Sequence, residues 1–237
     1  MVTVALIGGD GAGKTTIAKR LEEACPLPTK YLYMGINPQA GKFTLPTSRL
    51  VFLLKQSSYK KEASKSSQTQ SESVPAHYLE YSKTNRGPLW TALRLLNRLI
   101  EASYRQIIAI YYQIRGYIVI YDRHPLFETA PLPKKSGKKK FSWLTGANHW
   151  IISNLFPKPK LTIFLDAPAE LLHARKKEST PDYLDRQRTK YLKQGEITAN
   201  FIRIDATQPL EKVYVDVEQQ ILSFHRQNGG KRRINTF

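Results

Sequence analysis

A glycine-rich stretch near the start of the printed sequence constrains this chain more than any other feature. Residues 8–15 read GGDGAGKT and match the pattern G-x-x-x-x-G-K-[ST]. Residues 2–7 before it are mostly apolar, as in a strand that is buried on both faces. Residues 16–24 after it have apolar side chains at helical spacing. A strand, a glycine loop and a helix in this order predict a phosphate site formed by backbone N–H groups.

The loop and the residues around it form the predicted nucleotide site. Lys14 is expected to reach the β- and γ-phosphates, and the hydroxyl of Thr15 is expected to bind Mg²⁺. The positive end of the following helix attracts the same phosphates. The predicted nucleotide-binding residues are consecutive: Gly8, Gly9, Asp10, Gly11, Ala12, Gly13, Lys14, Thr15 and Thr16.

Short apolar runs alternate with helical patterns along the 237 residues, which is typical of a parallel sheet with helices on both faces. The predicted strands are residues 2–7, 30–35, 117–121, 161–166 and 201–205. The predicted helices are residues 16–24, 88–115, 143–156 and 209–225, with a further one opening at residues 168–175. We therefore expect a single α/β domain over residues 1–227. A mobile insertion near residues 55–87 and a disordered basic tail at residues 228–237 complete the predicted organisation.

Two acidic residues follow predicted strands and belong to the edge where such sheets bind ligands. Asp122 comes directly after the third strand, and we expect it to hold Mg²⁺ together with Thr15. Arg123 beside it is suited to bind an acceptor phosphate through a forked guanidinium. Asp166, after the fourth strand, is the competing candidate for the acid.

A third group of residues is basic and surrounds a predicted helix boundary. Arg175, Arg186 and Arg188 lie within residues 175–190. Guanidinium groups on a segment that closes over the nucleotide would neutralise the charge that develops on the γ-phosphoryl group. The competing interpretation is a charged helix face in contact with solvent.

The chain resembles the thymidylate kinase family of P-loop nucleoside monophosphate kinases. The resemblance is carried by residues 8–16 (GGDGAGKTT), 121–124 (YDRH), 165–168 (LDAP) followed by Arg175, and 204–206 (IDA) followed by 209–211 (PLE). It implies a three-layer P-loop NTPase fold with strand order 2-3-1-4-5, ATP and Mg²⁺ as cofactors, and a lid near residues 175–190. It also implies that Asp10 lies near the acceptor's sugar and that Arg123 binds the acceptor's phosphate.

The sequence departs from this family on the acceptor side. After the second strand the family has an Arg-Glu-Pro-Gly-Gly run, and this chain has YMGINP at residues 33–38. The resemblance implies transfer of the γ-phosphoryl group of ATP to dTMP or a related nucleoside monophosphate. One alternative is a kinase for a nucleoside or another small or lipid-linked acceptor, in which Asp122 would act as a base. Another is a non-kinase P-loop NTPase that binds nucleic acid.

The formal net charge of +18 favours contact with polyanions. The basic run from Lys134 to Lys140 is followed by Phe141, Trp143 and Trp150, which is the pattern of an anionic membrane surface or a nucleic-acid site. The competing interpretation is a solvated loop before a helix with core tryptophans. One cysteine, no recognisable signal peptide and no membrane-length apolar run predict a cytoplasmic protein. The family resemblance also makes a homodimer plausible, with the long helix that ends near Arg115 as its interface.

Overall fold

Each predicted strand is present in the computed structural model, which describes residues 2–35, 43, 45, 88–129, 150–154 and 156–229. The strands are β1 (Thr3–Gly8), β2 (Thr29–Tyr33), β3 (Ile118–Asp122), β4 (Leu161–Asp166) and β5 (Phe201–Asp205). The helices are α1 (Lys14–Ala24), α4 (Pro88–Ile114), α5 (Pro125–Thr129), α7 (Ala169–Arg175), α8 (Pro181–Glu196) and α9 (Leu210–Gly229). Residues 150–154 are also helical.

The five strands form one parallel sheet in the order β2-β3-β1-β4-β5. Leu6 of β1 is level with Asp122 of β3, and Gly8 is level with Leu165 of β4. The carboxyl ends of β1, β3 and β4 therefore reach the same edge of the sheet. This register brings the glycine loop and the two predicted acids to that edge.

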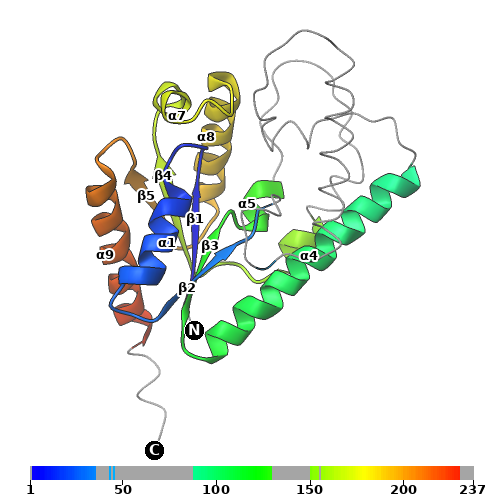
Figure 1. Ribbon diagram of the computed structural model, residues 1–237, viewed down its shortest axis with the longest axis horizontal. Coiled ribbons are helices and arrows are strands. Elements are labelled where there is room, and N and C mark those ends of the chain that lie inside the picture. Colours follow the sequence, from blue (N-terminus) through cyan, green and yellow to red (C-terminus); the bar gives the residue numbers. More distant parts are fainter. Residues whose placement is uncertain are drawn as a thin grey trace, which may run out of the picture.

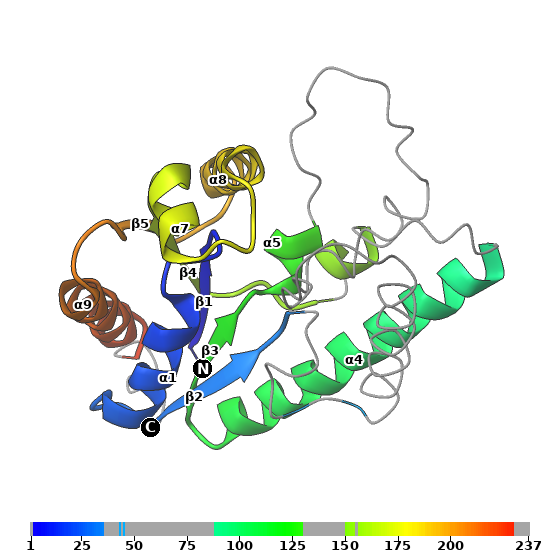
Figure 2. The same cartoon turned by 45° about the horizontal axis from the view of Figure 1, so that its top comes forward.

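Helices cover both faces of the sheet (Figure 1). Alternate residues of β1 show the division, because Val4 and Leu6 belong to one core cluster and Ala5 and Ile7 to the other. The first cluster includes apolar residues of α1 and α9, and the second includes residues of α4 and α8. The turned view shows α1 and α9 together on one side and α4 on the other (Figure 2). The predicted α/β class and the strand order are thus confirmed.

The boundaries of β4 and β5 match the sequence-based prediction, and the other boundaries differ from it by at most four residues. The first helix begins at Lys14 rather than at Thr16. Helix α9 continues to Gly229, so residues 228 and 229 of the predicted disordered tail are helical. The short helix α5 directly after β3 was not predicted. The predicted insertion at residues 55–87, the basic run at residues 134–140 and residues 230–237 of the tail lie outside the described residues. In the part of the chain that is described, no helix combines the length and apolarity needed to cross a membrane.

Candidate functional site at the carboxyl edge of the sheet

Two glycines give the loop after β1 its shape. Gly11 and Gly13 have φ angles of 90° and 85°, a region that side chains with a Cβ rarely adopt. A Cβ at Gly11 would also come within 2.6 Å of the carbonyl oxygen of Leu172 on α7. Gly13 is the residue before α1, so the helix axis begins at the loop itself. The loop is therefore bent tightly and packed directly against α7.

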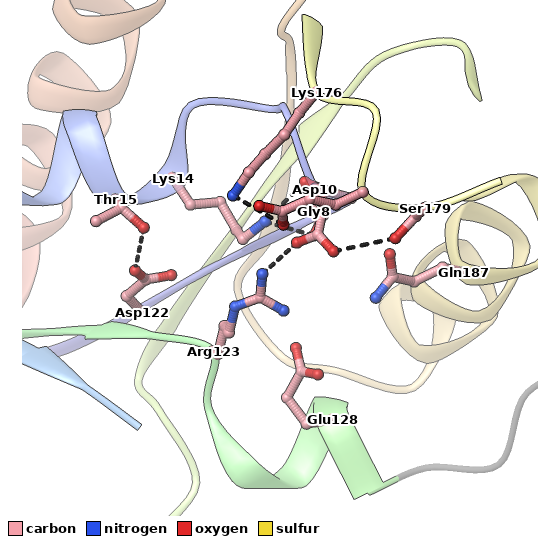
Figure 3. A network of polar contacts seen from close by, with 12 residues as sticks. Gly8, Asp10, Lys14, Thr15, Asp122, Arg123, Glu128, Lys176, Ser179 and Gln187 are labelled. Atoms are coloured by element: carbon pink, nitrogen blue, oxygen red, sulfur yellow. Dashed lines mark hydrogen bonds and ion pairs between the residues drawn. The ribbon is translucent and has the colours of Figure 1, made fainter. Parts of the chain in front are cut away.

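Lys14 turns back into the loop that precedes it (Figure 3). Its Nζ donates hydrogen bonds to the carbonyl oxygens of Gly8 and Gly9, at 2.8 and 2.7 Å. The residue is buried, and burial together with the nearby Arg123 charge lowers the pKa of the ammonium group. An ammonium group held at the centre of a loop in this way is placed to meet an anion that enters the loop.

Thr15 and Asp122 connect the start of α1 to the end of β3. The Thr15 hydroxyl donates to Oδ2 of Asp122 at 2.6 Å, and the Tyr31 hydroxyl of β2 donates to the same oxygen at 3.3 Å. Oδ1 of Asp122 is buried and has no hydrogen-bond partner among the described residues. A hydroxyl oxygen beside a carboxylate oxygen is a donor set that suits Mg²⁺.

The described residues contain no group of three or more histidine, cysteine or acidic side chains that could enclose a metal by themselves. Mg²⁺ usually keeps several waters and binds through one or two carboxylates plus substrate phosphates. The Thr15–Asp122 pair fits an ion of this kind, because waters and a phosphate ligand can supply the other positions.

Arg123 and Asp10 form an ion pair between the end of β3 and the loop (Figure 3). Oδ2 of Asp10 also accepts a hydrogen bond from Ser179 at 3.3 Å. Burial acts to raise the pKa of Asp10, but the Arg123 and Lys14 charges outweigh it and lower this pKa to about 2. Arg123 has a φ of 64°, which is uncommon for a residue with a side chain, and backbone strain of this kind clusters at functional sites.

Arg175 lies beside a pocket of about 450 Å³ on the other side of the loop. The pocket is lined by the loop residues 11–13, by residues 206–210 after β5, and by Val213 of α9. The Arg175 guanidinium donates to the carbonyl oxygens of Ala206 and Thr207, at 2.7 and 3.3 Å. A planar cation is therefore fixed at the wall of a pocket that the glycine loop also lines.

The other two predicted arginines have partners of their own. Arg188 binds both carboxylate oxygens of Asp166, at 2.6 and 3.0 Å, and Arg203 of β5 binds the same carboxylate. Arg186 pairs with Asp182 one turn earlier on α8. Because Asp166 is engaged by two guanidinium groups, Asp122 is the better candidate for a metal carboxylate.

The sequence analysis missed four residues that the fold adds to this site, which are Ser179, Glu128, Tyr191 and Gln187. Glu128 of α5 accepts a hydrogen bond from the Tyr191 hydroxyl at 3.1 Å, and Gln187 donates to the same hydroxyl at 3.2 Å. Glu128 points toward Arg123, and Gln187 extends from α8 toward the Asp10 side of the site (Figure 3). No local pattern singled out Glu128 or Gln187, because α5 and α8 bring them to the loop only through packing.

A comparison of the sequence with protein-family models finds no match.

Proposed function

We propose that this protein is an ATP-dependent phosphotransferase of the P-loop kinase type, similar in its donor site to thymidylate kinases. The observation that carries the proposal is the meeting of three groups at one sheet edge. These are the Lys14 ammonium inside the glycine loop, the Thr15 hydroxyl, and the buried Asp122 carboxylate 2.6 Å from it. Phosphoryl transfer needs little covalent help from the protein, so positioning and charge stabilisation account for catalysis.

Each group has a role in the proposed reaction. Lys14 and the loop N–H groups would hold the β- and γ-phosphates, and the nucleoside would occupy the pocket beside Arg175. Thr15 and Asp122 would hold a Mg²⁺ ion. Arg123 would face the acceptor, because it pairs with Asp10 and is not among the residues that line that pocket. When bound, Mg²⁺ supplies charge neutralisation at the phosphate oxygens.

Arg188 and Arg186 would need to leave their present partners to reach the transferred group. Asp166 holds Arg188 with two hydrogen bonds, and burial of that carboxylate is offset by its guanidinium neighbours, which lower its pKa. We therefore assign Arg175 to the donor nucleotide first. Arg188 is the candidate for a residue that moves when α8 closes over bound ATP.

The first experiment measures ATP binding and ATP consumption for the wild type and for Lys14→Ala. The wild type is expected to bind ATP with Mg²⁺ and to release ADP when an acceptor is supplied. Lys14→Ala is expected to reduce kcat/KM at least about 10³-fold, because transition-state charge on the γ-phosphoryl group loses its buried ammonium partner. Chelation of Mg²⁺ with EDTA should have a similar effect.

Lys212→Ala, an exposed lysine of α9, serves as the matched control and should behave as the wild type. The acceptor panel contains nucleoside monophosphates, nucleosides, and single- and double-stranded nucleic acid. A wild-type protein that binds no ATP, or a Lys14→Ala variant with unchanged turnover, would contradict the proposal. ATP hydrolysis that only nucleic acid stimulates, with no phosphoryl acceptor found, would favour the nucleic-acid-dependent NTPase instead.

A further inference from the structure

Polar side chains from four separate segments meet on the Arg123 side of the glycine loop. Asp10 belongs to the loop, Arg123 and Glu128 follow β3, Ser179 precedes α8, and Gln187 lies on α8 (Figure 3). On the proposed function, this is the side from which an acceptor would approach the γ-phosphoryl group. The chemistry of these side chains therefore bears on what the acceptor is.

The charge of Arg123 is already balanced by carboxylates. Asp10 forms an ion pair with it, and Glu128 points toward it. Burial acts against the charged form of Arg123, yet Asp10 and Glu128 outweigh burial and raise the pKa of the guanidinium. A phosphomonoester carries about −1.5 to −2 charges at neutral pH. Such an acceptor would have to displace Asp10 from Arg123 and would then lie beside two carboxylates.

Two lysines lie near these carboxylates, and they do not change this balance in favour of a phosphorylated acceptor. Lys14 donates hydrogen bonds to the carbonyl oxygens of Gly8 and Gly9. In the proposed reaction it binds the phosphates of ATP and not the acceptor. Lys176 lowers the pKa of Asp10, but its side chain is about half exposed and it pairs with Glu178 at 3.0 Å.

Gln187 adds an unused hydrogen-bond acceptor to the cluster. Gln187 is 2% exposed, and its Oε1 has no hydrogen-bond partner among the described residues. This oxygen lies beside the loop, because a Cβ added at Gly9 would be 3.8 Å from it. A buried amide oxygen without a partner is costly. An incoming O–H group would satisfy it, and a phosphate oxygen, which has no proton to donate in the dianion, would not.

The three carboxylates near the loop differ in how fully they are engaged. Asp122 accepts from Thr15 and Tyr31 and belongs to the proposed metal site. Asp10 accepts from Arg123 and Ser179, and its lowered pKa makes it a weak base. Glu128 accepts from the Tyr191 hydroxyl at 3.1 Å, and that bond orients the carboxylate while leaving its second oxygen to receive a proton.

We propose that the acceptor is a hydroxyl group of an unphosphorylated, uncharged molecule such as a nucleoside or a sugar, and that Glu128 is its catalytic base. The acceptor oxygen forms a bond to the γ-phosphorus while the bond from that phosphorus to the β,γ-bridging oxygen breaks. ADP leaves with the electron pair, and the hydroxyl proton passes to the Glu128 carboxylate. Gln187 and Asp10 accept hydrogen bonds from the acceptor's other hydroxyl groups.

This inference rests on the proposed function, so the experiment begins with ATP binding by the wild type. Failure to bind ATP with Mg²⁺ would contradict the phosphotransferase itself. With binding established, the second measurement uses water as the simplest hydroxyl acceptor. Glu128→Gln is expected to slow basal ATP hydrolysis about 10²-fold while the Kd for ATP changes less than twofold, because only the base is removed. Glu128→Asp should recover part of the rate.

Glu196→Gln, at the exposed end of α8, is the matched control and should hydrolyse ATP at the wild-type rate. Thermal melting checks that Glu128→Gln folds. Should it not fold, Tyr191→Phe replaces it, with an expected loss of about tenfold because Glu128 is then less well oriented. The proposal would be overturned if the Glu128 and Tyr191 variants both hydrolysed ATP at the wild-type rate. It would also be overturned if the wild type neither hydrolysed ATP nor transferred phosphate to any hydroxyl compound.

The third measurement compares matched acceptors that differ by one phosphate: thymidine with dTMP, deoxycytidine with dCMP, adenosine with AMP, and glucose with glucose 6-phosphate. The unphosphorylated member of at least one pair is expected to accept phosphate at least about 10²-fold faster than its phosphorylated partner. Nucleoside turnover would identify a base-bearing acceptor, and glucose turnover a sugar. Faster transfer to dTMP or another monophosphate than to its partner would overturn the inference and leave the proposed kinase function intact.

Discussion

His124 is a buried titratable residue directly after the Asp122-Arg123 pair. It is fully buried, its Nδ1 accepts a hydrogen bond from the Leu126 backbone N–H at 3.3 Å, and its ring meets Tyr121 edge-on at 5.0 Å. Burial lowers the pKa of this imidazole to about 4. The native protein therefore keeps His124 neutral at pH values where an unfolded chain protonates it.

Stability should consequently fall as the pH is lowered from about 6.5 to about 4. In this window the unfolded state binds a proton that the native state does not bind, so acidification favours unfolding. Between pH 7 and pH 5 we expect a loss of about 2 kcal/mol from this residue, measured as the free energy of unfolding in urea. His124→Phe should remove most of that pH dependence, and His225→Phe on α9 should keep it. If the free energy of unfolding fell equally with pH in the wild type and in His124→Phe, His124 would not be the source of this pH dependence.

Helix α4 anchors the chain where it leaves β2. Arg105, 2% exposed, donates to the carbonyl oxygens of Gly35 at 2.6 Å, Tyr33 at 3.2 Å and Phe43 at 3.0 Å. Its remaining nitrogen pairs with Glu101 one turn earlier on the helix, at 2.6 Å. One guanidinium thus holds the β2 exit against the α4 face. This is the region in which the sequence departs from the thymidylate kinase pattern.

Arg105→Met should destabilise the protein strongly. The variant keeps an apolar stem but leaves buried carbonyl oxygens and the Glu101 carboxylate without their cation, and breaking such a pair costs about 3 kcal/mol or more. For a chain of this length the expected fall in Tm is roughly 6–12 °C by calorimetry. The exposed Arg226→Met on α9 should change Tm by less than about 2 °C. If Arg105→Met lowered the free energy of unfolding by less than 1 kcal/mol, water would be replacing these contacts and the prediction would be wrong.

At the scale of the whole molecule, α4 lies along one side of the sheet (Figure 1). Several of its large apolar side chains are exposed. Ile107 is 65% exposed and Ile114 is 68% exposed, and Leu96 and Ile100 continue the same stripe. Apolar stripes of this kind on a surface helix are typical of contact with a partner. The homodimer through this helix stays a prediction.

A charge placed in this stripe tests the dimer. The double variant Ile107→Lys with Ile114→Lys should shift the wild-type mass from dimer to monomer in size-exclusion chromatography with light scattering at about 50 μM protein, because a buried lysine opposes association. Ile197→Lys, at an exposed position after α8, is the matched control and should leave the mass unchanged. A wild type that is monomeric at this concentration would contradict the prediction.

The sequence by itself determined the parts of this protein that depend on neighbouring residues. The apolar runs located all five strands, and β4 and β5 begin and end where the sequence predicted, because burial on both faces leaves a local pattern. The glycine loop was equally local, since its turns need glycine at set positions. Lys14 and Thr15 were predicted from the loop. Asp122 was predicted from its position after the third strand, because parallel strands end at a common edge.

Only the tertiary structure decided which charged groups pair with one another. Asp10 meets Arg123 across 113 positions of chain, and Asp166 is engaged by Arg188 and Arg203 rather than left open at the edge. Glu128 and Gln187 joined the site in the same way, through α5 and α8 packing beside the loop. A residue's neighbours in sequence set its helix or strand. Which charged residue pairs with it depends on how distant segments pack together. The local spacing of residues in the sequence does not predict that packing.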